Sequence, residues 1–344
     1  MKKTALLFVP LFALGLCAGC GSNPSEEEGE ESTEAREMLF DANFRDGIDV
    51  SGLESQTVSY TSWKYGGSSA SVDPFWRLGQ YCNLANTRAG YDSSRNDLSL
   101  GTLFEEAKGI EGQEGDFYTL TNRSGSKTIK VNPQTGAVKL NIDTSKEYVD
   151  QGTGQIRPRT NGEDWVHMIL EQSPGTVYLA QAESYVMSLD FTLDACDVYD
   201  GSIGAAQFQW IFTVHDKTSP IGDYFWFNVT LFDNRYEIFP GTQIYDGGKV
   251  DATGKFIYAP TGGELFGEGG GKVETGVTYH VELDLKDYMR RAFETAQSMG
   301  AMSESVWENC SVHGFNIGWE VSNVAKVGVT LENLSLKAKI PEEA

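Results

Sequence analysis

The segment between Arg157 and His167 brings together side chains that could bind a sugar. Its candidate residues are Arg157, Arg159, Trp165 and His167. A guanidinium group binds a carboxylate through two parallel hydrogen bonds, and an indole ring can pack on the apolar face of a pyranose. The segment could therefore bind a neutral sugar or a uronate. In a purely structural alternative, both arginines pair with nearby acids and Trp165 begins a core strand.

A second group of candidate binding residues occupies one face of an expected strand near residues 224–231. Apolar Phe225, Phe227, Val229 and Leu231 alternate with Tyr224, Trp226, Asn228 and Thr230. If the apolar set points into the core, then Tyr224, Trp226 and Asn228 face outward. Flat rings beside amide and hydroxyl groups suit a saccharide. A helix or a long loop could instead cover this face and make it a second core.

Two carboxylates at alternate positions of another expected strand could perform acid–base catalysis. Glu282 and Asp284 share one face of that strand, as the paired acids of glycoside hydrolysis would require. Their pattern favours the solvated side of an edge strand over a catalytic pair, and Asp287 is better explained as a helix cap. If the chain is an enzyme, Glu282 is the candidate of a hydrolase. His167 as base and Arg157 as the partner of a uronate are the candidates of a polysaccharide lyase.

Metal and thiol chemistry have weaker signals. Four clustered aspartates could hold structural calcium, although their spacing matches no ordered calcium loop: Asp190, Asp194, Asp197 and Asp200. Outside the N-terminal region the cysteines are Cys82, Cys196 and Cys310. An odd number of cysteines without CxxC spacing predicts buried thiols with at most one bridge. No cofactor is expected, and the question of structural calcium stays open.

Period-two alternation of apolar and polar residues dominates the chain from about residue 128 onward. It predicts strands at 137–142, 166–171, 176–179, 184–193, 208–214, 225–231, 255–258, 277–285, 314–321 and 327–338. A change of phase in the last of these predicts a bulge near Asn333. Helical spacing appears near residues 286–299, and Gly300 follows it. Strands separated by glycine-rich turns, with one helix among them, predict an all-β, antiparallel two-sheet sandwich.

The closing part of the chain resembles the concanavalin A-like jelly-roll sandwiches of carbohydrate-binding modules, polysaccharide lyases and glycoside hydrolases. The resemblance rests on the strand pattern and on the segments 315–321 (FNIGWEV) and 329–336 (VTLENLSL). It covers residues 128–340 and implies an antiparallel jelly roll that handles carbohydrate. Fold alone does not fix function, so binder and enzyme both stay open.

The N-terminus resembles the signal sequence of a bacterial lipoprotein. A basic start, an apolar run from Ala5 to Leu16 and the segment Cys17-Ala18-Gly19-Cys20 predict cleavage before a lipid-modified Cys20. The acidic segment after Cys20 cannot bury enough surface to fold. We therefore expect a signal peptide at 1–19, a disordered tether at 20–37 and one jelly-roll domain at 38–344.

The net charge of −22 argues against nucleic acid as a partner, because binding phosphates requires a basic face. Together these patterns predict an extracytoplasmic protein that is lipid-anchored to a bacterial membrane and binds an oligo- or polysaccharide without catalysis. A polysaccharide lyase, a glycoside hydrolase and a structural or protein-interaction lipoprotein are the alternatives. The predicted glycan ligands are Arg157, Arg159, Trp165, Tyr224, Trp226 and Asn228.

Overall fold

The structure is a computed structural model. It describes residues 4–6, 35–54, 57–69, 71–79, 109–122, 124–150, 152–159, 165–199, 201–219, 222–247 and 253–341. Residues 4–6, 51–54 and 57–60 are described through their backbone alone. The predicted lipid site Cys20, together with Cys82 and Asp200, lies outside the described residues.

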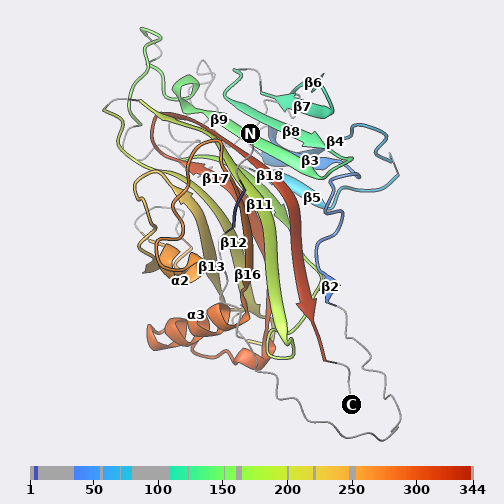
Figure 1. Cartoon of the computed structure of the whole chain (residues 1–344), viewed down its shortest axis with the longest axis vertical. Coiled ribbons are helices and arrows are strands. Elements are labelled where there is room, and N and C mark those ends of the chain that lie inside the picture. The colour runs from blue at the N-terminus through green and yellow to red at the C-terminus, as the bar shows by residue number, and fades with distance from the viewer. Residues whose placement is uncertain are drawn as a thin grey trace, which may run out of the picture.

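Two sheets, each of nine strands within the described part of the chain, pack face to face (Figure 1). Sheet A has the order β1 (Thr4–Leu6), β16 (Thr278–Asp284), β11 (Ser184–Val198), β18 (Ala325–Lys339), β9 (Ala137–Asp143), β8 (Lys127–Asn132), β7 (Phe117–Thr121) and β6 (Ile110–Glu114), and β2 (Arg36–Glu37) also pairs with β18. Sheet B has the order β14 (Thr242–Tyr245), β15 (Phe256–Ala259), β13 (Tyr224–Asp233), β12 (Ala206–Asp216), β17 (Cys310–Val321), β10 (Val166–Gln172), β5 (Trp76–Gly79), β3 (Ile48–Glu54) and β4 (Thr57–Trp63). The predicted jelly-roll β-sandwich is confirmed.

Alternation within the strands sorts the side chains into a core and two outer faces, because successive residues of a strand point to opposite sides. The inward set predicted from the sequence is buried: Met187, Leu189, Phe191, Trp210, Phe212, Phe225, Phe227, Val281 and Leu283. Rings from sheet B pack on one another in this core. Phe315 lies 5.5 Å from Trp210 and 6.2 Å from Phe212 between ring centroids.

Most strand pairs are antiparallel, as predicted, but three are parallel: β1 with β16, β3 with β5, and β13 with β15. The predicted strand at 176–179 is wrong. That segment makes a single bridge, from Tyr178 to Ser311, because it crosses from the end of sheet B to the start of β11 in sheet A.

The predicted helix is α3 (Lys286–Ser298), which lies at the lower end of the sandwich (Figure 1). Met289 and Phe293 on its apolar side are buried in the core. The predicted cap, Asp287, lies inside the helix, and the N-cap residue is Leu285, which makes no side-chain cap. Asp284, just before it, accepts the main-chain N–H of Lys286 with Oδ1 at 3.1 Å. A second, short helix, α2 (Gly262–Phe266), forms in a glycine-rich stretch that the sequence predicted to be a turn. Thr261 and Glu264 begin it with a capping box.

The register of the described long strands shifts at four places, and two of these β-bulges bear on the predictions and the site. Asn333 of β18 adopts a left-handed φ of 55°, and the register between β11 and β18 shifts there, which confirms the predicted bulge. The second bulge lies in β17, where Thr213 faces Gly314 but Val214 faces Val312. His313 is therefore the extra residue of β17.

The segment before residue 125 contributes strands to both sheets. Trp63 and Trp76 are buried, as expected, but Phe75 is 46% exposed and stacks on exposed Phe40 at 5.1 Å. Glu37 links the segment that begins the jelly-roll domain to β18, because its Oε1 accepts the main-chain N–H groups of Met38 and Leu336. Within the described residues, the structure contains no helix of the length and apolarity needed to span a membrane.

Candidate functional site

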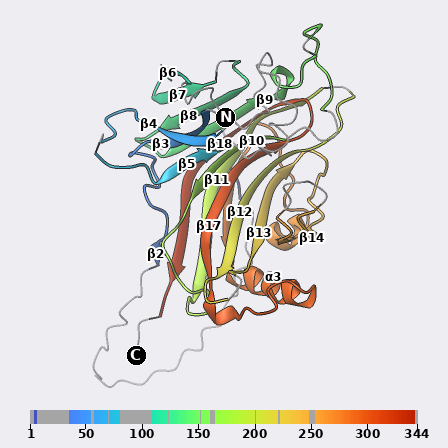
Figure 2. The same cartoon turned by 180° about the vertical axis from the view of Figure 1, so that it is seen from behind.

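The outer face of sheet B carries the strongest concentration of functional groups. We use this name for the side of β10, β17, β12 and β13 that points away from sheet A, which lies toward the viewer in Figure 2. Cross-strand register, not sequence proximity, decides which side chains meet on this face.

Glu320 is the best-positioned carboxylate on the outer face of sheet B. It lies on β17 directly opposite His167 of β10 and Gln207 of β12. Its Oε1 is 3.4 Å from His167 Nε2, and its Oε2 accepts a hydrogen bond from Gln209 Nε2 at 3.0 Å. The side chain of Glu320 is 26% exposed, so this carboxylate is fixed in orientation and still accessible.

A polar network extends from Glu320 across β12 to β13. The Oε1 atom of Gln209 accepts hydrogen bonds from Asn228 Nδ2 and Thr230 Oγ1, each at 3.2 Å. These contacts fix the orientation of the Gln209 amide, so its Nε2 must point toward Glu320. A buried amide that is fixed in this way holds the carboxylate in one position.

Glu171 supplies a second carboxylate on the same face. It lies on β10, its side chain is 10% exposed, and its Oε2 is 3.8 Å from the guanidinium of Arg77 on β5. A Cβ atom at Gly79 would be only 2.7 Å from Glu171 Oε1, so the carboxylate occupies the space above this glycine. Gly79 thereby makes room for Glu171 to lean along the sheet.

The two carboxylates converge on one cross-strand row. Gly79, Ile169, Gly318 and Gln209 are register partners across β5, β10, β17 and β12. Glu171 leans over Gly79 at one end of this row, and Glu320 reaches Gln209 at the other end. Glu171 leans over β5, and Glu320 lies over β17 between His167 and Gln209, so the two carboxyl groups are at least two strand spacings, about 9.5 Å, apart.

The middle of this face is shielded from solvent. The outward-pointing side chains of this region are nearly buried: Ile169 is 3% exposed, Gln209 6%, Asn228 8% and Thr230 3%. A partly enclosed position strengthens electrostatic interactions around Glu171 and Glu320, because water screens them less. It also means that Asn228 holds Gln209 rather than presenting its amide to a ligand.

The predicted segment 157–167 leads into this region from one end. Arg157 and Arg159 are half-buried in the loop before β10, and Arg157 Nη1 donates to the carbonyl of Pro158 at 3.0 Å. Half-buried Trp165 immediately precedes β10, and His167 is the partner of Glu320. Of this segment, the structure brings His167 into direct contact with a carboxylate.

Tyr224 and Trp226 lie on the same outer face but toward its other end. Both are half-buried, and Trp226 is opposite Thr213, which in turn faces Gly314 of β17. Six residues separate Gly314 from Glu320 along β17, a distance of about 20 Å at the rise of a strand. The two predicted binding clusters therefore share a face and occupy opposite ends of it.

Glu282 lies on the other sheet. It is exposed on β16, opposite Ser188 of β11, so it points away from the sandwich on the far side from His167. Two residues on the opposite outer faces of a sandwich cannot act on one substrate bond. Asp284 accepts main-chain N–H groups of Tyr185 and Lys286, which gives this acid a structural role.

Two of the aspartates considered for calcium have local side-chain partners. Asp190 contacts His280 Nδ1 at 2.7 Å and Asn333 Nδ2 at 2.8 Å, and Asp194 accepts from Thr330 at 2.7 Å. Among the residues that the structure describes, no three His, Cys, Asp or Glu side chains are grouped so that they could hold a metal ion.

The described cysteines are thiols. Cys196 lies on β11 of sheet A and Cys310 on β17 of sheet B, and neither forms a disulfide within the described residues. Burial, with Asp197 adding to it, raises the pKa of Cys196 to about 11. Burial, with Asp216 and Glu308 adding to it, raises the pKa of Cys310 to about 12. Both groups are therefore neutral and unreactive near neutral pH.

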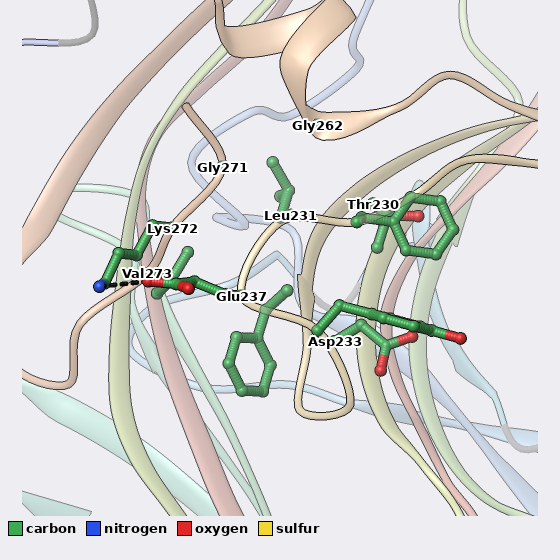
Figure 3. Close-up of a pocket in the computed structure, with 11 residues that line it drawn as sticks. Thr230, Leu231, Asp233, Glu237, Gly262, Gly271, Lys272 and Val273 are labelled. Atoms are coloured by element: carbon green, nitrogen blue, oxygen red, sulfur yellow. Dashed lines mark hydrogen bonds and ion pairs between the residues drawn. The ribbon is translucent and has the colours of Figure 1, made fainter. Parts of the chain in front are cut away.

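A small cavity of about 110 Å³ opens beside the end of β13 (Figure 3). Asp233, Glu237 and Lys272 are among its lining residues, and Lys272 Nζ pairs with Glu237 Oε1 at 2.5 Å. Ligand pockets typically measure about 300 to 1,000 Å³, so this cavity is too small for an oligosaccharide. The outer face of sheet B remains the candidate site.

Sequence reasoning did not single out Glu171 or Glu320 as functional. A usable signal was present, because each is a carboxylate at an outward position of a strand whose inward positions are mostly apolar. Such strands occupy the middle of a sheet, where an isolated carboxylate is costly unless it has a partner or a function.

Comparison with known proteins gives structural likeness only. No family model and no curated protein matches the chain. Among solved structures, a family 12 xyloglucanase from Bacillus licheniformis is 9% identical, with 67% of this chain and 96% of that chain covered and a TM-score of 0.38. Endoglucanase cel12A from Rhodothermus marinus is 13% identical, with 68% and 100% covered and a TM-score of 0.36. The family 11 xylanase from Neocallimastix patriciarum is 7% identical, with 67% and 94% covered and a TM-score of 0.34. At this level of likeness no residue of the chain takes a role from those proteins.

Proposed function

We propose that the chain is a glycoside hydrolase that acts on a polysaccharide and uses Glu320 and Glu171 as its two carboxylates. The observation that carries the proposal is their convergence on the row of Gly79, Ile169, Gly318 and Gln209, with Glu320 held by both His167 and Gln209. Glycoside hydrolysis requires two positioned carboxyl groups, and this face supplies them from neighbouring strands. The predicted hydrolase candidate Glu282 is replaced in this role because it lies on the other sheet.

The spacing of the two carboxylates favours inversion at the anomeric carbon. Inverting enzymes place their carboxyl groups about 6.5 to 9.5 Å apart to leave room for a water molecule, and retaining enzymes place them about 5 to 5.5 Å apart. A separation of at least two strand spacings, about 9.5 Å, exceeds that of a retaining pair and lies at the upper end of the inverting range. One carboxyl group would protonate the leaving oxygen while the other activates water on the opposite face of the sugar.

The test is product analysis on a panel of soluble β-glucans, xylans and uronate-containing polysaccharides. We expect new reducing ends from at least one polymer, and NMR taken early in the reaction should show the inverted anomer. Release of unsaturated uronates would instead identify a lyase. Retention of configuration would contradict the pairing of Glu171 with Glu320.

Non-catalytic glycan binding is the second candidate function, and the exposed edges of Tyr224 and Trp226 on this face favour it. Trp226→Ala should weaken binding of a hydrolysis-resistant oligosaccharide by about 1 to 3 kcal/mol, the range found for stacking on flat ligands. Calorimetry measures the affinity, and the free energy of unfolding should fall by only about 1 kcal/mol because the side chain is half-buried. If binding is lost through unfolding, Trp226 belongs to the core. Saccharide binding without any product from any polymer would favour the binder over the enzyme.

We also propose that the protein is extracytoplasmic and is a bacterial lipoprotein whose lipid is attached to Cys20. Cys20→Ala should move the protein from the membrane fraction to the soluble fraction, because acyl chains supply the anchoring energy. The melting temperature of the body should stay the same, since its described strands come from residues 4–6 and from residue 35 onward, and none of them contains Cys20. A variant that stays membrane-bound would contradict the lipid anchor.

A further inference from the structure

The lower end of the outer face of sheet B carries a histidine pair that hydrolysis does not explain. His215 of β12 and His313 of β17 have ring centroids 5.4 Å apart, and the ring of Tyr224 lies 6.3 Å from that of His215. The bulge of β17 is what places His313 there, because a regular strand would turn it toward the opposite side. Bulges often re-aim a side chain beside a functional site.

His215 has unmet hydrogen-bonding capacity. Within the described part of the chain, neither Nδ1 nor Nε2 of His215 has a hydrogen-bond partner, although both atoms are buried. A buried polar group without a partner costs about 1 to 3 kcal/mol, and such a cost usually indicates a role beyond stability. An external acceptor or donor would satisfy this ring.

Two lysines, Lys217 and Lys255, lie near this pair, although the whole chain carries −22. Burial, then the positive charge of Lys217 and the neighbouring His215, lowers the pKa of His313. Lys255 Nζ lies 4.8 Å from the ring centroid of Tyr224, but its charge is paired with Asp223. Among the described residues no acid forms an ion pair with Lys217, so Lys217 is the cation that would attract a bound anion.

Two of the three acids of this region already have partners, and the third, Glu308, is exposed. Asp216 accepts the main-chain N–H groups of Thr218, Ser219 and Val306. Asp223 accepts Met302 N–H and pairs with Lys255 at 2.7 Å. The charged and titratable groups around the pair, among described residues, are Lys217, Lys255, Tyr224, Asp216, Asp223 and Glu308.

We propose that His215, His313 and Lys217 bind an anionic substituent, a sulfate or a carboxylate, on the glycan whose rings pack against Tyr224 and Trp226. The inference rests on the proposed function, and it adds that the substrate is a charged polysaccharide. The pair lies about 20 Å along the strands from the Gly318 row, so the charged group belongs to a sugar several units from the scissile bond.

A shared metal ion is the competing occupant of this pair. Two imidazoles at this separation could ligate one transition metal, since neutral histidine is a common metal ligand. The ammonium of Lys217 repels a divalent cation and attracts an anion, which decides in favour of the anion.

The test compares the affinity of the soluble body for dextran sulfate, polygalacturonate and uncharged dextran by calorimetry. At about pH 5.5, where histidines gain charge, we expect at least one charged polymer to bind at least about tenfold more tightly than dextran, or ~1.4 kcal/mol. Tighter binding of dextran sulfate would identify the substituent as a sulfate, and tighter binding of polygalacturonate would identify it as a carboxylate. Protonation of His313 strengthens anion binding, so the preference should shrink by about pH 8 as that proton is lost.

The double variant Lys217→Gln, His313→Asn should bind the charged polymer no more tightly than it binds dextran. Both side chains are exposed, so the melting temperature should hold. His280→Asn is the matched control, since it removes an exposed histidine from the outer face of sheet A. Equal affinity of the unaltered protein for charged and uncharged polymers, or an unaffected double variant, would overturn the anion site. A preference that requires added Zn²⁺ and is lost with a chelator would show a metal site instead. These measurements report binding and do not depend on turnover. The anion site can therefore be refuted while hydrolysis by Glu320 is confirmed.

Discussion

Glu320→Gln should lower turnover of the responsive polysaccharide by at least about a thousandfold, within the range for the loss of a positioned acid or base. The amide keeps the size of the carboxylate and can still accept a hydrogen bond from Gln209, but it can neither donate a proton nor activate water. Oligosaccharide binding should therefore persist while the rate is lost, which appears as a fall in kcat with little change in KM.

Two further variants make this measurement specific. Glu171→Gln should cause a similar loss, because both carboxyl groups take part in each turnover. Glu282→Gln is the matched control, since it makes the same chemical change on the exposed strand β16 of the other sheet, and its rate should not change. If Glu320→Gln retains the full rate while Glu282→Gln does not, the catalytic face has been assigned to the wrong sheet.

Phe212→Ala should lower the free energy of unfolding by about 3 to 5 kcal/mol, the usual cost of deleting a buried phenyl ring. Phe212 is fully buried between the sheets, with its ring centroid 5.3 Å from Trp210, 6.2 Å from Phe315 and 6.5 Å from Phe227. The rigid strands around it cannot close the resulting cavity, so both the transfer energy and the packing contacts are lost.

Denaturant unfolding measures this effect, and the m-value should stay constant if only stability changes. The neighbouring Thr213→Ala is the control, because Thr213 is half-buried on the outer face and should cost less than about 1 kcal/mol. A loss below about 1 kcal/mol for Phe212→Ala would mean that the two faces of β12 have been assigned the wrong way round.

The sequence by itself determined which residues of each long strand face the core. A period of two is a local property of extended backbone, so alternation in β11, β12, β13 and β16 revealed their inward sides without knowledge of their neighbours. The bulge at Asn333 was visible for the same reason, since one extra residue inverts the pattern along the strand. The helix near residue 286 followed from its own spacing, although the identity of its cap did not.

Tertiary structure alone decided which outward residues meet. Glu171 and Glu320 are far apart in the chain, and their convergence depends on the order β5, β10, β17, β12 and on the register that aligns Gly79 with Gly318. The alternation pattern of a strand carries no information on its neighbours in the sheet, because any strand with the same pattern could bury the same face. The sequence named Glu282 and not Glu320 as the hydrolase candidate for that reason, and only the tertiary structure, which places β16 in sheet A, showed the difference. The bulge that turns His313 toward His215 was hidden as well, because it is defined by a mismatch of register between two strands, and that mismatch exists only once β12 and β17 have paired.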